Sequence, residues 1–513
     1  AALVMTGHIE LPAVGAVGPQ RAMAGVFYTL PLDIQSESLP SVKVSGLPAG
    51  LRYNASAGRI EGAPAAPAEK SVTVSAKNVN VTNAVMTFTL TIEPLPGWAQ
   101  GSFSGACRLG AIEAGVAEMT VSAQGKITGR VSYRGTNYSF GANSYTNGGG
   151  FVFATEAVAG KTRLPLTVSV AQPAPDPAAP AGLGVAEGEL SCGQAGTLAF
   201  TLYRHLWKDN GMIGAAAEYA GYYTAILPCG LEAGAGYLTL TVSQNGTVKA
   251  AGKLADGTKL SLSATLLADE TGRVLAVLYS APAAYKGGAF FAAIEFAVSD
   301  TGDRPLLPVG TLRWANLNPQ ATGDYGAGFD RELSLSGGWY DTTANLYRYY
   351  ADAELFVDGE ASVTPAIMVG TNRYESVWWT PYGIALTPAT NRTGVLSGFS
   401  APQAEAPAPK EGGYDYAGTA NAVSLRMNLT RATGLFKGTF KAWFDYGTTH
   451  TSRTLSYEGV LVPGRADTED TVEGGGFFLW ADKGSYVNPS GKRASYTFNW
   501  SYSFLLSAGQ TAE

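Results

Sequence analysis

Charged residues are scarce in this sequence, at 15% of 513 residues, against about 25% in an average globular chain. Long amphipathic helices need charged straight-chain residues on their solvated face, so an architecture of long helices is excluded. In place of the missing charged residues the sequence has 64 glycines and many Thr, Ser, Tyr and Val residues, which favour strands and turns. The composition predicts an all-β chain, and its length predicts several domains.

Basic clusters and long apolar runs are also missing. The formal net charge is −6, whereas a nucleic-acid-binding protein needs a basic surface that neutralises phosphates, so we expect no nucleic-acid partner. No apolar run approaches the ~20 residues of a membrane-spanning helix. The chain opens at Ala1 with an apolar stretch and no charged segment before it. That opening is typical of a mature secreted or cell-surface protein whose export signal has been removed.

Cysteine and histidine number three each, too few for a disulfide framework or for the common zinc motifs. Cys192 and Cys229 fall in one expected domain and are the candidate disulfide. The alternative is that all the cysteines are buried thiols. Neither a nucleophile elbow nor a phosphate-binding loop is present. We therefore expect no cofactor, no catalytic residues and no enzymatic activity.

The first part of the chain has a regular pattern of strands and turns. The sequence from Gly46 to Pro64 reads GLPAGLRYNASAGRIEGAP, and SVTVSAKNVNVTNAVMTFTLTI follows from Ser71 to Ile92. Alternation in the second stretch gives each strand one solvated and one buried face. We expect strands at residues 26–34, 42–45, 71–76 and 86–92.

These residues resemble the bacterial putative-Ig family of cell-surface β-sandwich repeats. The resemblance implies an Ig-like β-sandwich over residues 1–96. It also implies an extracellular spacer or adhesion module that carries no active site of its own.

An internal repeat begins after residue 96. Residues 101–129, 221–252 and 418–444 each read as a strand, a connection, an alternating strand, a glycine turn and a strand, which is the pattern of antiparallel meanders. This part loosely resembles repeat-bearing bacterial surface proteins of unassigned function. The expected domains are β-meander repeats at 97–182, 183–302 and 413–513, with an aromatic-rich β domain at 303–400.

Two Pro/Ala-rich stretches lie at residues 171–180 and 401–413, close to the edges of these expected domains. Such stretches are extended and semi-rigid. Each is either a true domain boundary or a long crossover within one barrel.

Aromatic residues are concentrated between Gly337 and Tyr382. An aromatic face can stack on the apolar face of a sugar ring, and the alternative is core filling with cross-strand aromatic pairs. Trp378 and Trp379 are adjacent and would point to opposite faces of a strand, so one of them needs a cover, a second subunit or a ligand. The candidate ligand-binding residues are Trp339, Tyr340, Tyr374, Trp378, Trp379 and Tyr382.

Carboxylates gather at Asp467, Glu469 and Asp470. Several oxygen ligands from a flexible loop can hold Ca²⁺, so these three are the candidate metal ligands, although their spacing departs from the common calcium-loop pattern. The alternative is a solvated acidic loop. Paired carboxylates here or near residue 330 are also the minimum that sugar cleavage requires.

Three functions follow from these features. The leading prediction is an extracellular structural or adhesive surface protein, which assembles with itself or with other surface proteins into a layer or filament. Low charge favours such association because self-repulsion is weak, and Ala1–Pro12 could add as a strand to a neighbour's sheet. The alternatives are a carbohydrate-binding surface protein that uses the aromatic platform, and an all-β glycoside hydrolase or lyase.

Overall fold

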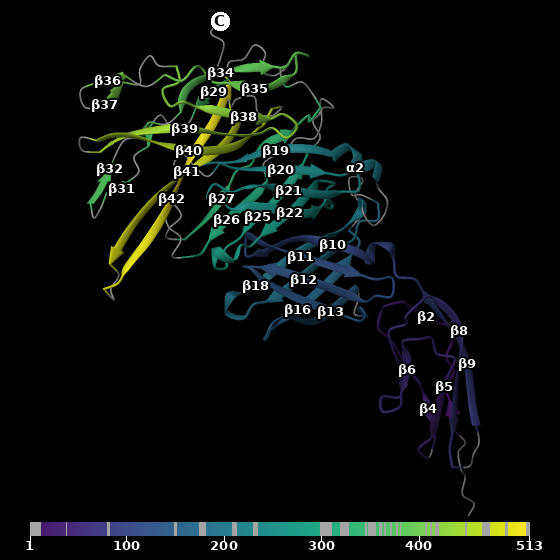
Figure 1. Cartoon of the computed structure of the whole chain (residues 1–513). Helices are drawn as coiled ribbons and strands as arrows, with labels where there is room; N and C mark the ends of the chain where they lie inside the picture. The colour runs from purple at the N-terminus through teal and green to yellow at the C-terminus, as the bar shows by residue number, and fades with distance from the viewer. Residues whose placement is uncertain are drawn as a thin grey trace, which may run out of the picture. The chain divides into compact units, whose positions relative to one another are not determined.

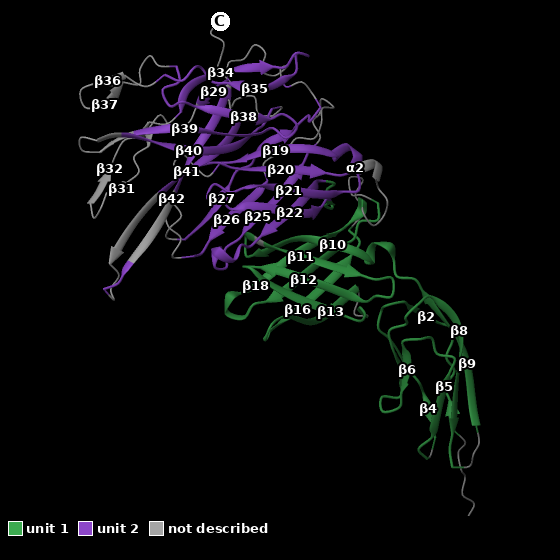
Figure 2. Cartoon of the chain, viewed as in Figure 1, with its two compact units in different colours: residues 1–209, 267–272 green, residues 210–266, 273–513 purple. Residues whose placement is uncertain are grey.

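The computed structural model is all-β, as the composition predicts, with a β-sandwich followed by barrel-like sheets (Figure 1). It divides into two compact units, residues 1–209 with 267–272, and residues 210–266 with 273–513 (Figure 2). No helix among the described residues is long and apolar enough to cross a membrane. The structure describes residues 12–36, 38–79, 83–147, 151–173, 181–207, 213–228, 234–297, 310–318, 328–343, 346, 355–358, 362–363, 366–369, 372–375, 378–379, 381–405, 408–410, 413–415, 420–446, 449–463, 472–487 and 491–508.

The first domain of unit 1 is a sandwich of two sheets. One sheet has the order β2-β9-β8-β5, with β2 parallel to β9 and the other neighbours antiparallel, and the second has the order β3-β7-β6. The short strands β1 and β4 pair with each other. The strands are β1 (Ala13–Val14), β2 (Gln20–Met23), β3 (Tyr28–Pro31), β4 (Ile34–Gln35), β5 (Ser41–Ser45), β6 (Leu51–Asn54), β7 (Arg59–Gly62), β8 (Ala68–Lys77) and β9 (Asn83–Glu93).

Alternation along β8 and β9 builds the core of this sandwich. Val72, Val74 and Leu90 are completely buried. Between them, Thr73 and Thr87 point outward, and their hydroxyl oxygens lie 3.2 Å apart. A period of two therefore separates the buried face from the solvated face, as a half-buried strand requires.

Three of the four strands expected in this domain are confirmed, at residues 42–45, 71–76 and 86–92. The strand expected at 26–34 is interrupted. After β3 ends, Leu32 donates its N–H to the carbonyl of Gly58 at 2.9 Å and leaves the ladder.

The second domain of unit 1 is a closed barrel of eight antiparallel strands. Two meanders, β10 to β13 and β15 to β18, follow each other around the ring. The ring closes where β10 pairs with β18 and where Ser139 of β13 meets Val158 of β15. The strands are β10 (Gly101–Leu109), β11 (Ile112–Val121), β12 (Ile127–Tyr133), β13 (Thr136–Ala142), β15 (Phe151–Ala159), β16 (Thr162–Ala171), β17 (Val185–Ser191) and β18 (Thr197–Arg204).

Apolar side chains fill the inside of this barrel. Phe103, Val131, Phe153 and Leu198 are each 1% exposed or less, and eight strands enclose a space just wide enough for side chains to fill. The Pro/Ala-rich stretch at 171–180 joins β16 to its direct neighbour β17, so it is a crossover within one barrel. The expected domain boundary between residues 182 and 183 therefore falls inside a closed sheet.

Unit 2 begins with helix α2 and a nearly closed ring of strands. The strands β19 to β22 and β24 to β27 form two meanders, β28 pairs with β19, and β22 lies beside β24. The elements are α2 (Ile213–Tyr219), β19 (Gly221–Leu227), β20 (Gly236–Val242), β21 (Thr247–Lys253), β22 (Lys259–Thr265), β24 (Val274–Ser280), β25 (Phe290–Phe296), β26 (Thr311–Asn316), β27 (Phe329–Leu333) and β28 (Ser336–Trp339).

The rest of unit 2 is built around one large sheet that contains the series β38-β39-β40-β41-β42-β29-β34-β35, and β35 lies beside β38. Because β29 pairs with both β34 and β42, the expected domains at 303–400 and 413–513 share this sheet. The strands are β29 (Leu355–Asp358), β34 (Tyr382–Thr390), β35 (Leu396–Ser400), β38 (Arg426–Thr430), β39 (Leu435–Tyr446), β40 (Thr449–Leu461), β41 (Val472–Val487) and β42 (Arg493–Ala508).

Candidate functional site

Tyr340, one of the six predicted platform residues, is a core residue. Its side chain is 1% exposed, its hydroxyl donates to the carbonyl of Arg431 at 2.5 Å, and its ring meets Tyr222 edge-on. A ring without an accessible face cannot stack on a sugar. For Tyr340 the prediction of ligand binding is therefore wrong, and the core-filling alternative holds.

The other five predicted platform residues are distributed over four strands. Tyr382 opens β34 and is 59% exposed, whereas Trp339 at the end of β28 is half-buried. Tyr374 lies in β32 (Asn372–Glu375), and Trp378 and Trp379 form β33. For these three residues the structure describes the backbone but not the side chains. Ligand binding by these five residues stays a prediction.

The candidate calcium ligands Asp467, Glu469 and Asp470 lie outside the described residues. Within the described part of the chain, no group of three or more His, Cys, Asp or Glu side chains is arranged to hold a metal ion. The calcium site also stays a prediction.

The predicted disulfide between Cys192 and Cys229 is not formed. Cys192 is a free thiol next to β17 in unit 1, where its Sγ lies 3.7 Å from the carbonyl of Leu190. Cys229 lies outside the described residues, in the sequence of unit 2. The expected domain at 183–302 placed the two cysteines together, whereas Cys192 follows a strand of the first barrel. Cys107 is a buried thiol inside that barrel, and burial raises its pKa.

Within unit 1, two glycine turns join the sandwich to the barrel. Gly25 lies between β2 and β3, and Gly125 lies in the turn between β11 and β12. A Cβ added to Gly25 would lie 2.4 Å from the Cα of Gly125. Both glycines have φ of +73°, a conformation that side chains disfavour. The two backbones therefore touch directly, and neither position can carry a side chain without displacing the other.

Tyr145 adds a backbone bridge to this junction. Its N–H donates to the carbonyl of Gly25 at 2.9 Å, and Phe27 donates its N–H to the carbonyl of Tyr145 at 2.8 Å. The Tyr145 hydroxyl donates to the carbonyl of Ala99 at 2.9 Å. Because the side chain is completely buried, desolvation raises the pKa of its phenol, so the hydroxyl stays a donor beyond the pH at which an exposed tyrosine ionises.

Aromatic contacts fix Phe151 beside the bridge. Its ring meets Trp98 and Tyr145 edge-on, with centroids 5.0 and 5.3 Å apart. Leu95, in the connection from β9 to the barrel, is buried in the barrel core. Edge-to-face pairs of this kind stabilise one arrangement of the rings, so the barrel side of the junction is ordered by packing.

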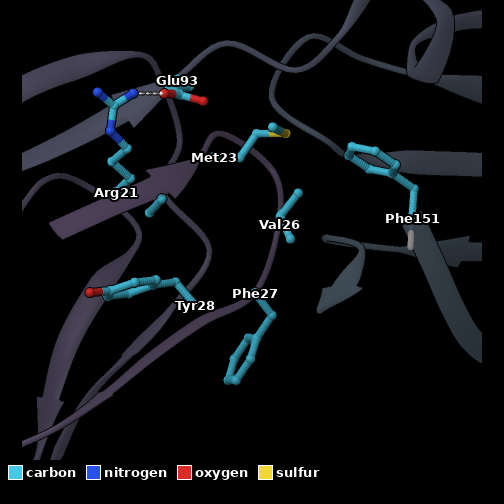
Figure 3. Close-up of a pocket in the computed structure, with 8 residues that line it drawn as sticks. Arg21, Met23, Val26, Phe27, Tyr28, Glu93 and Phe151 are labelled. Carbon is cyan, nitrogen blue, oxygen red and sulfur yellow. Dashed lines mark hydrogen bonds and ion pairs between the residues drawn. The ribbon is translucent and has the colours of Figure 1, made fainter. Parts of the chain in front are cut away.

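A groove of about 350 Å³ opens at this junction. In Figure 3, Met23 and Val26 lie between Tyr28 on one side and Phe151 on the other. Above Tyr28 in this view, Arg21 and Glu93 form an ion pair. The groove is lined by Arg21, Ala22, Met23, Val26, Phe27, Tyr28, Glu93 and Phe151.

The charged rim of the groove is internally neutral. An Nη atom of Arg21 lies 2.6 Å from a carboxylate oxygen of Glu93, and the two side chains are 79% and 42% exposed. Among the described residues the guanidinium makes no second hydrogen bond. Tyr28, whose hydroxyl lies 3.3 Å from the Gln20 amide oxygen, has its pKa raised by burial. The site therefore offers apolar faces, free donors and acceptors, and no uncompensated charge.

None of these groove residues stands out in the sequence as a binding residue. Phe27 fell within an expected strand, and nothing in the local pattern links residues 21–28 with Glu93 or Phe151. Phe27 is exposed because the turn at Gly25 packs against the barrel, and the local sequence does not show this packing.

The sheet order and turns of the first domain define an Ig-like β-sandwich. The family described as "Putative Ig domain" matches residues 12–93, so the resemblance seen in the sequence is confirmed for this domain. The remainder of the chain is not assigned to a family. No curated protein matches the sequence.

Similarities to solved structures are low. A putative α-galactosidase from Bacteroides fragilis NCTC 9343 is 16% identical, over 19% of this chain and 21% of that chain, with a TM-score of 0.16. The matched part spans about a fifth of that structure. The N-terminal eight Ig domains of Down Syndrome Cell Adhesion Molecule are 9% identical, over 96% of this chain and 73% of that chain, with a TM-score of 0.14. The extracellular domain of Protocadherin GammaB4 is 9% identical, over 96% and 84%, with a TM-score of 0.13.

Proposed function

We propose that the chain is an extracellular structural or adhesive protein of the cell surface, without enzymatic activity. One observation carries this proposal: the putative-Ig domain at residues 12–93 is joined to the following barrel by backbone hydrogen bonds and the contact of Gly25 with Gly125. A flexible tether would need neither. A β-sandwich held in a fixed orientation serves as a rigid spacer that presents the parts beyond it.

The filled barrel supports the same role. Side chains rather than a chamber occupy its interior, so its bulk contributes shape and stiffness. The low share of charged residues favours association with further copies or with other surface proteins. Nucleic acid is not a proposed partner, because the net charge of −6 opposes phosphate binding.

Electron microscopy and sedimentation velocity of the purified full chain test the assembly. We expect filaments, layers or discrete oligomers, and a strictly monomeric chain at high concentration would contradict self-assembly. Removal of residues 1–12 then shows whether that segment links neighbouring copies. Antibody labelling of intact and lysed producing cells tests the location, and labelling confined to lysed cells would contradict a surface role. Turnover of polysaccharide substrates would overturn the non-enzymatic assignment.

A carbohydrate-binding role is the second candidate. The exposure of Tyr382 favours it, because a ring on the surface can stack on a sugar. We expect Trp378→Ala and Trp379→Ala to abolish polysaccharide binding if the predicted platform is used. Unchanged binding in both variants would remove this platform.

A further inference from the structure

The groove at the junction combines an apolar wall with a polar rim (Figure 3). The wall begins with Phe27, which is 37% exposed. Leaving a phenylalanine ring in water costs roughly 25 cal/mol for each Å² of its apolar surface. Phe27 cannot readily turn inward, because its N–H is bound to the carbonyl of Tyr145 and Gly25 is seated against Gly125. The fold therefore holds this ring at the surface.

The opposite wall is preorganised. Phe151 is fixed by Trp98 and Tyr145, and Met23 and Val26 pack against the barrel core beneath it. A ligand that enters this groove meets surfaces that are already ordered, so little conformational entropy is lost on binding.

The rim selects for a neutral ligand. Arg21 and Glu93 neutralise each other at 2.6 Å, and the remaining lining residues carry no charge. An anionic ligand would face the Glu93 carboxylate and a cationic ligand the Arg21 guanidinium, so either charge is repelled by one member of the pair. Neighbouring hydroxyl groups on a sugar ring each donate and accept hydrogen bonds. Two of them can engage the Glu93 carboxylate and the free N–H groups of Arg21 together.

We propose that the groove between the Ig-like domain and the first barrel binds a neutral saccharide. The apolar face of one ring lies against the aromatic wall, where its weakly positive C–H groups meet the negative face of the π-system. Its hydroxyls bind Arg21 and Glu93. This site is separate from the aromatic platform at residues 339–382, and it goes beyond the proposed scaffold role because a monomeric chain would bind equally well.

Saturation-transfer NMR and affinity electrophoresis of the full chain test the proposal. The probes are maltohexaose, cellohexaose and mannohexaose, with hexagalacturonate as an acidic sugar and a proline-rich peptide as a different ligand class. At least one neutral probe binds, and Phe27→Ala and Arg21→Gln each weaken it about tenfold or more, equivalent to 1.4 kcal/mol. Hexagalacturonate binds more weakly.

Two matched controls separate this site from general surface effects. Arg163→Gln breaks another exposed ion pair, with Glu156 on the barrel surface, and Ile112→Ala removes an apolar side chain that is 44% exposed. Both leave binding unchanged. The proposal is overturned if no neutral probe binds, if only the peptide binds, or if binding survives both groove variants. Binding that is lost in Trp378→Ala but kept in Phe27→Ala also overturns it and assigns the sugar to the platform.

Discussion

Gly25 and Gly125 lie so close that a Cβ on Gly125 would fall 2.3 Å from the Cα of Gly25. The pair is the point where the sandwich and the barrel of unit 1 meet. Through this pair, two turns that are far apart in the sequence contact each other directly. The backbone hydrogen bonds of Tyr145 and the groove lie beside this contact.

Gly125→Ala should loosen this junction. We expect faster hydrogen exchange at the N–H groups of Phe27 and Tyr145, because the added methyl group displaces Gly25. Hydrogen exchange with mass spectrometry measures this. The control is Gly160→Ala, where φ is also left-handed at +58° but nothing lies within 4 Å of the added Cβ. It should cost about 1–2 kcal/mol from backbone strain and leave those N–H groups protected. Equal exchange in the two variants would contradict the contact.

Glu61 should make the Ig-like domain sensitive to acid. The amide of Asn54 and the guanidinium of Arg59 bind its carboxylate at 2.8 and 2.7 Å and lower its pKa from the ordinary value of 4.5 to about 2. A carboxylate with a lower pKa in the folded state stabilises the fold above the unfolded pKa. That stabilisation is lost as the pH falls from about 4.5 to about 2.

Glu61→Gln should therefore destabilise the domain at neutral pH and flatten its pH dependence between these values. Urea denaturation followed by hydrogen exchange in β6 and β7 reports on this domain alone. Glu118→Gln, which alters an exposed ion pair with Arg130, should keep the wild-type profile. A wild-type profile in Glu61→Gln would refute the role of Glu61.

Glu458, in β40 of the large sheet, should stabilise the packing of that sheet against the ring of strands that contains β20 and β21. Its carboxylate accepts a hydrogen bond from the hydroxyl of Tyr237 at 2.9 Å and pairs with Lys253 at 2.5 Å. Glu458→Ala should lower the free energy of unfolding by about 1–3 kcal/mol, because it leaves a partly buried hydroxyl and an ammonium group without their acceptor. Glu156→Ala, in an exposed pair with Arg163, should change it by about 0.5 kcal/mol or less. Calorimetry compares the two, and an equal effect would contradict this role for Glu458.

The two described thiols should differ in reactivity. Cys192 is half-buried and Cys107 fully buried, and burial raises the pKa of both. We expect a thiol reagent to modify Cys192 slowly at neutral pH and Cys107 only after unfolding. Mass spectrometry of the non-reduced chain should show no bridge at Cys192. If the non-reduced chain is lighter than the reduced chain by two hydrogens, and Cys192 does not react with the thiol reagent, the predicted disulfide is present after all.

Local pattern was sufficient for individual strands. The alternation at residues 71–76 and 86–92 predicts β8 and β9 correctly, because burial of Val72 and Val74 follows directly from a period of two. The strand expected at 26–34 was too long, since nothing in its sequence marks the point where Leu32 turns to Gly58.

The closure of the first barrel could not be predicted from the local sequence pattern. Phe103 of β10 pairs with Arg204 of β18, about a hundred positions later, and this pairing makes the Pro/Ala-rich stretch a crossover rather than a boundary. The ligand role predicted for Tyr340 was wrong for a similar reason, because Tyr222 and Arg431, which contact it, are remote in the sequence.

The sequence alone determined the all-β class and the Ig-like first domain, since these depend on composition, turn residues and a two-residue period. Only the tertiary structure decided which strands close the barrel, which aromatic rings are buried and where Phe27 stays exposed. Each of these depends on contacts between residues far apart in the chain, and local periodicity carries no information about which partner a strand or a turn will meet.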